Sequence, residues 1–301
     1  MKISDEKQTS QRNCEEEAMT YINDLTSAGE WARLDHQAGL VGSVTGLLPP
    51  LLEDEAWTNI LDVGCGPGHW ALDVAADRQE AHVTGIDLSA DMMEYANARA
   101  RTRHLTNVSF QVQDFLASKL PFPEQSFDLI NVRFAVGWLK KGGWLLLLSR
   151  CFVLLKPGGY VVITEGESIY TTSPALQRLQ ELLCAGLYAS GYGLSGSPRF
   201  MGVVAQLGSL LAQTSFQQMP THVSVLDYSY VHEEANRAWR ESFHALISES
   251  SLFLLQAGVT TTEELAEVDA QLLIDMYQEN FCGVGPLFTF SAQKPVGAAK
   301  E

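Results

Sequence analysis

The residues with the clearest chemical purpose are three glycines at alternate positions, Gly64, Gly66 and Gly68, which follow Asp62. They stand between an apolar run and a helical pattern, and a strand, a glycine turn and a helix in this order form nucleoside-type cofactor sites. Without a Cβ atom, glycine lets a ligand approach the backbone. The spacing D-x-G-x-G-x-G differs from the dinucleotide pattern G-x-G-x-x-G, and Asp62 favours a ligand with a positive amino-acid end over a pyrophosphate. A simple tight turn is the alternative for the glycines alone.

Two more carboxylates follow the next two predicted strands. Asp87 ends the segment 82–87 and lies about twenty residues past the glycines, where a βαβ unit places an acid on ribose hydroxyls. A carboxylate can accept hydrogen bonds from both hydroxyls. Asp114 and Phe115 end the alternating segment 108–115, and an acid beside an aromatic ring suits the amine and the face of an adenine base. The alternative for either acid is that it caps the helix that follows.

Taken together, these segments resemble the class I S-adenosylmethionine-dependent methyltransferases. The resemblance covers roughly residues 55 to 165 and rests on 62–68 (DVGCGPG), 85–89 (GIDLS) with Met92 and Met93, 113–115 (QDF), 126–133 (SFDLINVR) and 154–160 (LLKPGGY). It implies an α/β fold, namely a Rossmann-like, doubly wound, seven-stranded sheet that is mainly parallel, with an antiparallel last strand. N-terminal helices and helical cap insertions are expected around this core.

The resemblance also implies a cofactor, S-adenosyl-L-methionine, with S-adenosyl-L-homocysteine as the product. Gly64 and Gly66 would line the methionine moiety, Asp87 would bind the ribose, and Asp114 would meet the adenine amino group. The backbone around Val132 and Arg133 would close over the methionine end. The complete predicted cofactor set is Asp62, Gly64, Cys65, Gly66, Asp87, Leu88, Met92, Asp114, Phe115, Val132 and Arg133.

The catalytic residues are less evident than the cofactor residues. Methyl transfer from a sulfonium is an in-line displacement that needs alignment, exclusion of water and, for some acceptors, removal of a proton. Many members of the family place a histidine shortly after the fourth strand, where this chain has Trp138. We therefore predict Glu165 as the base, because it ends the fifth strand at the edge where ligands bind. A capping or solvated role is the alternative for this acid. Further candidates are Glu167, Tyr21, His36, His232 and His244.

The elements that must position these residues follow from periodicity and turn signals. Strands are predicted at 59–63, 82–87, 108–112, 127–132, 160–165, 221–230 and 287–293. Helices are predicted at 15–25, 27–40, 144–155, 174–188, 200–214, 233–255 and 262–279, and the third of these should stop at the segment 156–159 (KPGG). The resulting division is an N-terminal helical cap (1–55), a cofactor-binding core (56–165), cap helices with the helix before strand six (166–215), and C-terminal strands with a helical insertion (216–301).

Aromatic residues recur in the regions predicted as cap. They can wall a pocket for an aromatic or isoprenoid acceptor, although packing in an ordinary core is the favoured alternative. The residues are Tyr188, Tyr192, Phe200, Tyr228, Tyr230 and Phe281.

The composition of the chain limits the classes of molecule that it can bind. The 301 residues include 20 basic and 36 acidic side chains, a net charge of −16, which argues against nucleic acid because phosphate backbones are held by clustered Lys and Arg. The one basic cluster, Arg99 to Arg103, ends a predicted helix, where it complements the helix dipole. No apolar run is long enough to span a bilayer, no signal peptide is evident, and the five cysteines are scattered. We predict a cytoplasmic enzyme without a metal site that acts on a small molecule, and a homo-oligomer is left open.

Two other functions are compatible with parts of the sequence. The first is a protein that binds S-adenosylmethionine, or a cyclase-type enzyme on the same scaffold, that does not transfer the methyl group. Trp138 in place of a histidine motivates this alternative. The second is a nicotinamide-dependent dehydrogenase, which the glycine spacing disfavours.

Overall fold

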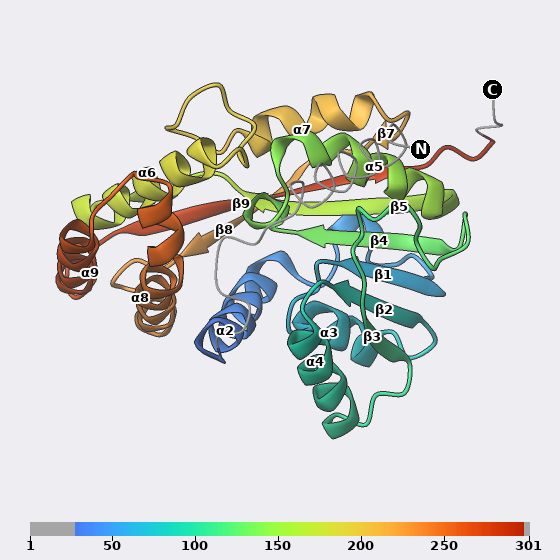
Figure 1. The fold of residues 1–301 in the computed structure, drawn as a ribbon. Coiled ribbons are helices and arrows are strands. Elements are labelled where there is room, and N and C mark those ends of the chain that lie inside the picture. The colour runs from blue at the N-terminus through green and yellow to red at the C-terminus, as the bar shows by residue number, and fades with distance from the viewer. Residues whose placement is uncertain (1–27, 298–301) are drawn as a thin grey trace, which may run out of the picture.

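A single mixed sheet forms the centre of the molecule in the computed structural model, which describes residues 28–297 (Figure 1). Five parallel strands stand in the order β3-β2-β1-β4-β5, and β9 then pairs antiparallel with both β5 and β8. The bounds of these strands are β1 Asn59–Val63, β2 His82–Asp87, β3 Val108–Val112, β4 Phe127–Arg133, β5 Leu155–Gly166, β8 His222–Asp227 and β9 Gly283–Gln293. The predicted seven strands and the antiparallel last strand are thereby confirmed.

Two short strands add to the predicted seven. They are β6 (Tyr170–Thr171) and β7 (Gln217–Gln218), and both pair with β9. Because β9 is eleven residues long, it extends past its main partners and offers free backbone groups to these two-residue segments. They were not predictable from alternation, which needs a longer run to be visible.

The helices connect and flank the strands. In the described part of the chain they are α2 Ala28–Thr45, α3 His69–Asp77, α4 Ala90–Thr102, α5 Trp144–Leu154, α6 Pro174–Ala189, α7 Val203–Ala212, α8 Glu233–Gln256 and α9 Thr262–Met276, with short 3-10 turns at Pro50–Leu52, Ala135–Gly137 and Lys141–Gly143. The helix predicted at 15–25, which includes Tyr21, lies outside the described residues.

Both faces of the parallel strands are buried. Ile60 and Leu61 are adjacent on β1, and their side chains enter different cores. One core holds α3 and α4, whereas the other holds α5 and α7. Such burial explains why the strands are apolar on both sides, as is usual in doubly wound α/β sheets. The prediction of helices on both faces is confirmed.

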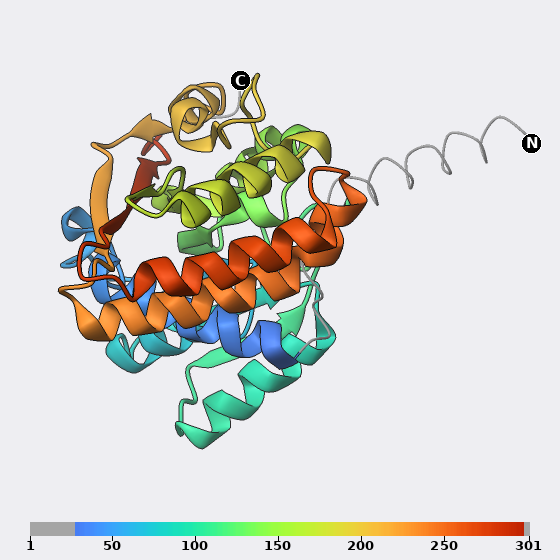
Figure 2. The same cartoon turned by 90° about the vertical axis from the view of Figure 1, so that its left-hand side faces the viewer.

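A third core lies beside the sheet. It brings together side chains of α6, α8 and α9 with Val41 of α2 and Leu287 of β9. Figure 2 shows α8 and α9 running side by side, with α2 next to α8. Within residues 28–297, no helix has both the length and the apolar character that a bilayer crossing requires.

Several predicted boundaries were wrong. Strand β9 begins at Gly283 and not at 287, helix α2 continues past 40 to Thr45, and β5 also differs. Strand β5 was expected to begin at Tyr160 after a stop at 156–159, but it begins at Leu155 and includes this segment. The pairing with β4 jumps from Phe127↔Leu155 to Leu129↔Tyr160, so the extra residues form an irregular bulge. Gly158 and Gly159 still hydrogen-bond to Lys294 at the end of β9, which keeps the bulge within the sheet.

Candidate functional site

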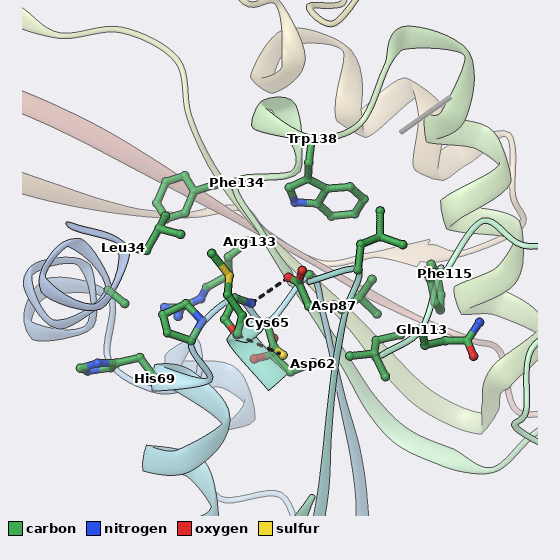
Figure 3. Close-up of a pocket in the computed structure, with 18 of the residues that line it drawn as sticks. Leu34, Asp62, Cys65, His69, Asp87, Gln113, Phe115, Arg133, Phe134 and Trp138 are labelled. Atoms are coloured by element: carbon green, nitrogen blue, oxygen red, sulfur yellow. Dashed lines mark hydrogen bonds between the residues drawn. The ribbon is translucent and has the colours of Figure 1, made fainter. Parts of the chain in front are cut away.

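A cavity opens at the carboxyl ends of β1, β2 and β4 (Figure 3). Strand β1 lies between β2 and β4 in the sheet, so the cavity occupies the point where the strand order reverses, the usual ligand site of such sheets. It encloses about 1090 Å³ of empty space, part of which is open to solvent. Its lining residues are Leu34, Gln37, Ala38, Asp62, Val63, Gly64, Cys65, Gly66, Pro67, His69, Ile86, Asp87, Leu88, Met92, Gln113, Phe115, Arg133, Phe134 and Trp138.

The glycine turn forms the floor of this cavity. Gly64, Gly66 and Gly68 have φ angles of +65°, +53° and +78°, which strain any residue with a Cβ atom. Oδ2 of Asp87 accepts a hydrogen bond from the Gly66 N–H at 3.0 Å, while Oδ1 accepts one from the Ser89 N–H at 3.1 Å. Asp87 therefore holds the turn and keeps lone pairs that can accept further hydrogen bonds.

Three polar groups around the turn lack a hydrogen-bond partner among the described residues. Oδ2 of Asp62 and Nε1 of Trp138 are buried and unpaired, and the Arg133 guanidinium makes no hydrogen bond or ion pair with any residue in 28–297. Oδ1 of Asp62 accepts from Asn131 at 2.8 Å. Burial raises the pKa of Asp62 to about 6, against the opposing effect of Arg133. The turn is thus surrounded by one hydrogen-bond acceptor, on Asp62, and two donors, on Arg133 and Trp138, that are available to a ligand.

Helix α2, which precedes the first strand of the sheet, supplies one wall of the cavity. Leu34, Gln37 and Ala38 line the cavity from this helix, and Figure 3 shows Leu34 on the same side as Phe134. Below them, Nδ1 of His69 bonds to Asp35 of α2 at 2.8 Å. These contacts close one side of the cavity with a segment distant in sequence.

Two carboxylates flank the imidazole of His69, an arrangement that favours its protonated form. Its Nε2 lies 3.3 Å from Asp73, so both ring nitrogens face carboxylates. Hydrogen bonds to Asp35 and Asp73 raise the pKa of His69 to about 9. A histidine that donates through both nitrogens has no lone pair with which to accept a proton, so His69 does not qualify as a base in this state.

Glu165, the predicted base, does not line the cavity. Its side chain is fully buried at the end of β5, and Oε1 accepts from the Ala135 N–H at 2.6 Å. Oε2 has no partner among the described residues. Burial raises its pKa to about 8. Its contact is with the turn 134–138, which carries Phe134 at a φ of +53° and leads to Trp138. The geometry supports a role in positioning this turn.

The other candidate acids and histidines also lie away from the cavity. Glu167 caps α7, since its two carboxylate oxygens accept from the backbone N–H groups of Gly202 and Val204. His232 pairs with Asp227 and His244 with Asp269, and all four are away from the cavity wall. His36 faces a separate groove between α2 and α8.

The cavity brings together most of the predicted cofactor set. Nine of its eleven residues line the wall, whereas Asp114 and Val132 do not. Oδ1 of Asp114 instead accepts from the Leu116 N–H at 2.7 Å, and Val132 is packed inside the core. The neighbours Gln113 and Phe115 line the cavity where Asp114 was expected.

Several lining residues escaped prediction. Leu34, Gln37 and Ala38 carry no chemical signature, and only the packing of α2 brings them to the site. His69 could have been found, because it directly follows the glycine turn at the start of α3. The six aromatic residues of the supposed cap are absent from the cavity lining. Tyr192, Tyr228 and Phe281 are buried in cores, and Tyr188, Phe200 and Tyr230 are exposed.

Known proteins resemble this chain over the same segment. Residues 60–159 match the family described as "Methyltransferase domain". Demethylmenaquinone methyltransferase of Listeria welshimeri is 34% identical over 116 residues, covering 38% of this chain and 48% of the relative. The enzyme of that name from Lactococcus lactis is 32% identical over 143 residues, covering 47% of this chain and 50% of the relative. The chain thus spans about half the length of the curated relatives it matches.

The solved structures agree on the fold. Phosphoethanolamine N-methyltransferase 2 of Haemonchus contortus, in complex with phosphomonomethylethanolamine and S-adenosylhomocysteine, superposes with a TM-score of 0.50 at 19% identity. The match covers 86% of this chain and 52% of that chain. With the glycine turn, the strand order and the matched domain in agreement, residues 60–159 form a methyltransferase domain of the class I S-adenosylmethionine-dependent family.

Proposed function

We propose that this protein binds S-adenosyl-L-methionine in the cavity above the glycine turn and transfers its methyl group to a small-molecule acceptor. The observation that carries the proposal is the set of unpaired groups there. Oδ2 of Asp62 is a buried acceptor, and Arg133 and Nε1 of Trp138 are donors. An amino acid's ammonium and carboxylate groups complement this set, whereas a pyrophosphate would face the Asp62 carboxylate.

Each part of the cofactor has residues suited to hold it. Asp62 would accept from the ammonium group, and Arg133 with Trp138 would donate to the carboxylate. Asp87 would bind the ribose hydroxyls, since a carboxylate accepts from both. Gln113 and Phe115 stand near the end of β3, where the adenine is expected. When bound, the sulfonium supplies an activated methyl group for in-line displacement.

The remaining walls favour an acceptor with an apolar, flat part. Leu34 and Ala38 of α2, together with Phe134 and Trp138, present aliphatic and aromatic surface. Such surfaces bind rings through burial and stacking, which agrees with the ring-bearing acceptor named for the demethylmenaquinone methyltransferase relatives. The protein would align this acceptor with the methyl group and exclude water.

Calorimetry with S-adenosyl-L-homocysteine tests the cofactor part of the proposal. We expect Asp87→Ala to weaken binding by at least about tenfold, the effect of losing about 1.4 kcal/mol or more of hydrogen bonding. Asp91→Ala is the matched control, because Asp91 is an exposed acid on the first turn of α4 that does not line the cavity. Absence of binding to the unaltered protein, or equal affinities for it and Asp87→Ala, contradicts the proposal.

Incubation with S-adenosylmethionine labelled in its methyl group tests the transfer. Reduced quinols and other phenolic rings are the first acceptors to try, and label recovered in one of them supports methyl transfer. The alternative is a protein that binds the cofactor without transferring its methyl group, which Trp138 in place of a histidine motivates. Tight binding with no label in any acceptor would favour that alternative.

Asp62 predicts a pH dependence of cofactor binding. The pKa of its buried carboxyl is raised to about 6, so the group gains a proton as the pH falls through that value. A neutral carboxyl attracts an ammonium group less than a carboxylate does. We expect the affinity for S-adenosylhomocysteine to fall by about tenfold between pH 7.5 and pH 5.

The Asp62→Asn variant is the control for this dependence. Its amide retains a hydrogen-bonding oxygen but cannot ionise, so it should bind more weakly at pH 7.5 and show a flatter profile in calorimetry at both pH values. A profile equally steep in the variant would assign the titration to another group.

A further inference from the structure

Helix α2 is the part of the cavity wall that the matched domain does not provide. Every other lining residue falls between Asp62 and Trp138, whereas Leu34, Gln37 and Ala38 come from α2. Figure 1 shows α2 lying between α8 and α3. Its later part is anchored in the third core by Val41. Its earlier turns, where Trp31 and Leu34 pack against the core of α3 and α4, close the cavity on this side.

An ionic junction fastens those earlier turns to the cofactor turn. Asp35 follows Leu34 on α2, and its Oδ1 accepts from Nδ1 of His69 and from Arg99 of α4. The Asp35, His69 and Arg99 side chains are 30%, 24% and 21% exposed, so solvent screens them only in part. Arg99 also donates to the Pro67 carbonyl at 3.2 Å. One carboxylate therefore connects α2, α3, α4 and the glycine turn.

The junction belongs to a longer chain of alternating charges. Asp73 of α3 faces Nε2 of His69 and accepts at 2.7 Å from Arg103, the residue that follows α4. On the side of α2 toward α4, the rings of Trp31 and Tyr95 also pack together, with their centroids 6.0 Å apart. Because Asp35 alone of these charges lies on α2, it is the group through which the network acts on the wall.

We propose that Asp35 is a positioning residue that latches α2 over the cofactor cavity, and that this latch sets the lifetime of the bound cofactor. The inference rests on the proposed binding of S-adenosylmethionine. Leu34, Gln37 and Ala38 can contact a ligand only while α2 is closed. A ligand that binds only when α2 is closed over the cavity stabilises that closed form. A mutation that lowers the fraction of closed protein weakens the apparent affinity in proportion to that fraction.

Stopped-flow measurement of S-adenosylhomocysteine release tests the latch in the full chain. We expect Asp35→Asn to accelerate release by about tenfold, with a smaller change in the association rate. Added salt should accelerate release from the unaltered protein more than from Asp35→Asn, because the variant has lost the screened ion pairs. Asp35→Glu keeps the charge and should recover part of the slow release.

Amide hydrogen exchange on the ligand-free protein gives a second readout that needs no cofactor. Residues 31–38 should exchange faster in Asp35→Asn than in the unaltered protein, while strands β1 and β4 should not change. Asp77→Asn is the matched control, since it removes a carboxylate of α3 that pairs with its neighbour Arg78 and lies away from the cavity. It should alter neither measurement.

A double-mutant cycle distinguishes a specific effect of the junction from a general loss of stability. Arg99→Gln opens the same junction from α4, so it should also accelerate release, and its effect should add little to that of Asp35→Asn. Release rates of Asp35→Asn and Arg99→Gln within twofold of the unaltered protein would overturn the latch. Failure of the unaltered protein to bind S-adenosylhomocysteine would instead overturn the proposed function, so the two failures are distinguishable.

Discussion

Replacing Gly64 by alanine is expected to abolish measurable binding of S-adenosylhomocysteine and to destabilise the fold by about 2–4 kcal/mol. Two physical effects add here. The φ angle of Gly64 is +65°, which an L residue adopts only with strain. A Cβ atom would also stand 3.0 Å from two carbon atoms of the Trp138 indole, so the indole would have to shift by a few tenths of an ångström. Calorimetry and urea denaturation measure the two consequences.

Gly66 offers a matched control for the strain alone. Its φ angle is similar, at +53°, but a Cβ atom there would meet no atom within 4 Å. Gly66→Ala should therefore cost only about 1 kcal/mol of stability, although its methyl group would enter the cofactor cavity and weaken binding. Equal losses of unfolding free energy in the two variants would contradict the importance of the Trp138 contact.

Trp138→Ala completes the comparison. Combining it with Gly64→Ala removes the indole that the new methyl group would strike, so the double variant should be more stable than the sum of the single losses predicts. The coupling energy should be about 1 kcal/mol or more for groups in direct contact. Additive losses would show that the strain of the turn, and not the indole, limits this position.

The core of the fold could be predicted because its signals are local. Strands β1, β2 and β3 have the predicted bounds, since each is a short apolar or alternating run that ends at a turn or an acid. The limits of β5 and the two-residue strands could not be predicted. The extra residues of β5 pair irregularly with β4. Strands β6 and β7 pair with β9, which lies more than 110 residues from β6 and about 75 residues from β7 in the sequence.

The site was only partly predictable for the same reason. The floor of the cavity follows from one turn and the ends of its neighbouring strands, which a sequence pattern reveals. The wall from α2 packs through long-range contacts, among them the hydrogen bonds of Asp35 with residues 34 and 64 positions away. The turn after β4 could not be predicted from the sequence either, because phenylalanine rarely adopts the φ angle of +53° seen at Phe134.

Glu165 shows how a strand end can suggest a base and yet serve another purpose. Its position at the end of β5 was predicted, but the hydrogen bond to Ala135 turns its carboxyl into the core. We expect Glu165→Gln to keep the methyl-transfer rate within about fivefold, because a glutamine oxygen can accept the same N–H. Loss of a general base typically costs 10²–10⁴-fold in rate. A loss of that size in steady-state kinetics would make Glu165 the base after all.

The same carboxyl predicts a large dependence of stability on pH. The pKa of Glu165 is raised from 4.5 to about 8 in the folded protein, so the folded state keeps a proton that the unfolded chain releases between these values. Stability contributed by this group therefore falls as the pH rises from 4.5 to 8, by an amount on the order of 5 kcal/mol, and levels off above 8.

Urea denaturation at pH 5, 7 and 9 checks this dependence. Glu165→Gln should be less sensitive to pH than the unaltered protein and should exceed its stability at pH 9, where a buried carboxylate with an unpaired Oε2 is most costly. Glu80→Gln, which removes an exposed acid, controls for the change in net charge. Glutamine preserves the hydrogen bond to Ala135. A retained methyl-transfer rate, together with a flatter dependence of the unfolding free energy on pH, would therefore assign Glu165 to holding the turn that carries Phe134 and Trp138. Parallel pH profiles for the two proteins would place the buried proton elsewhere.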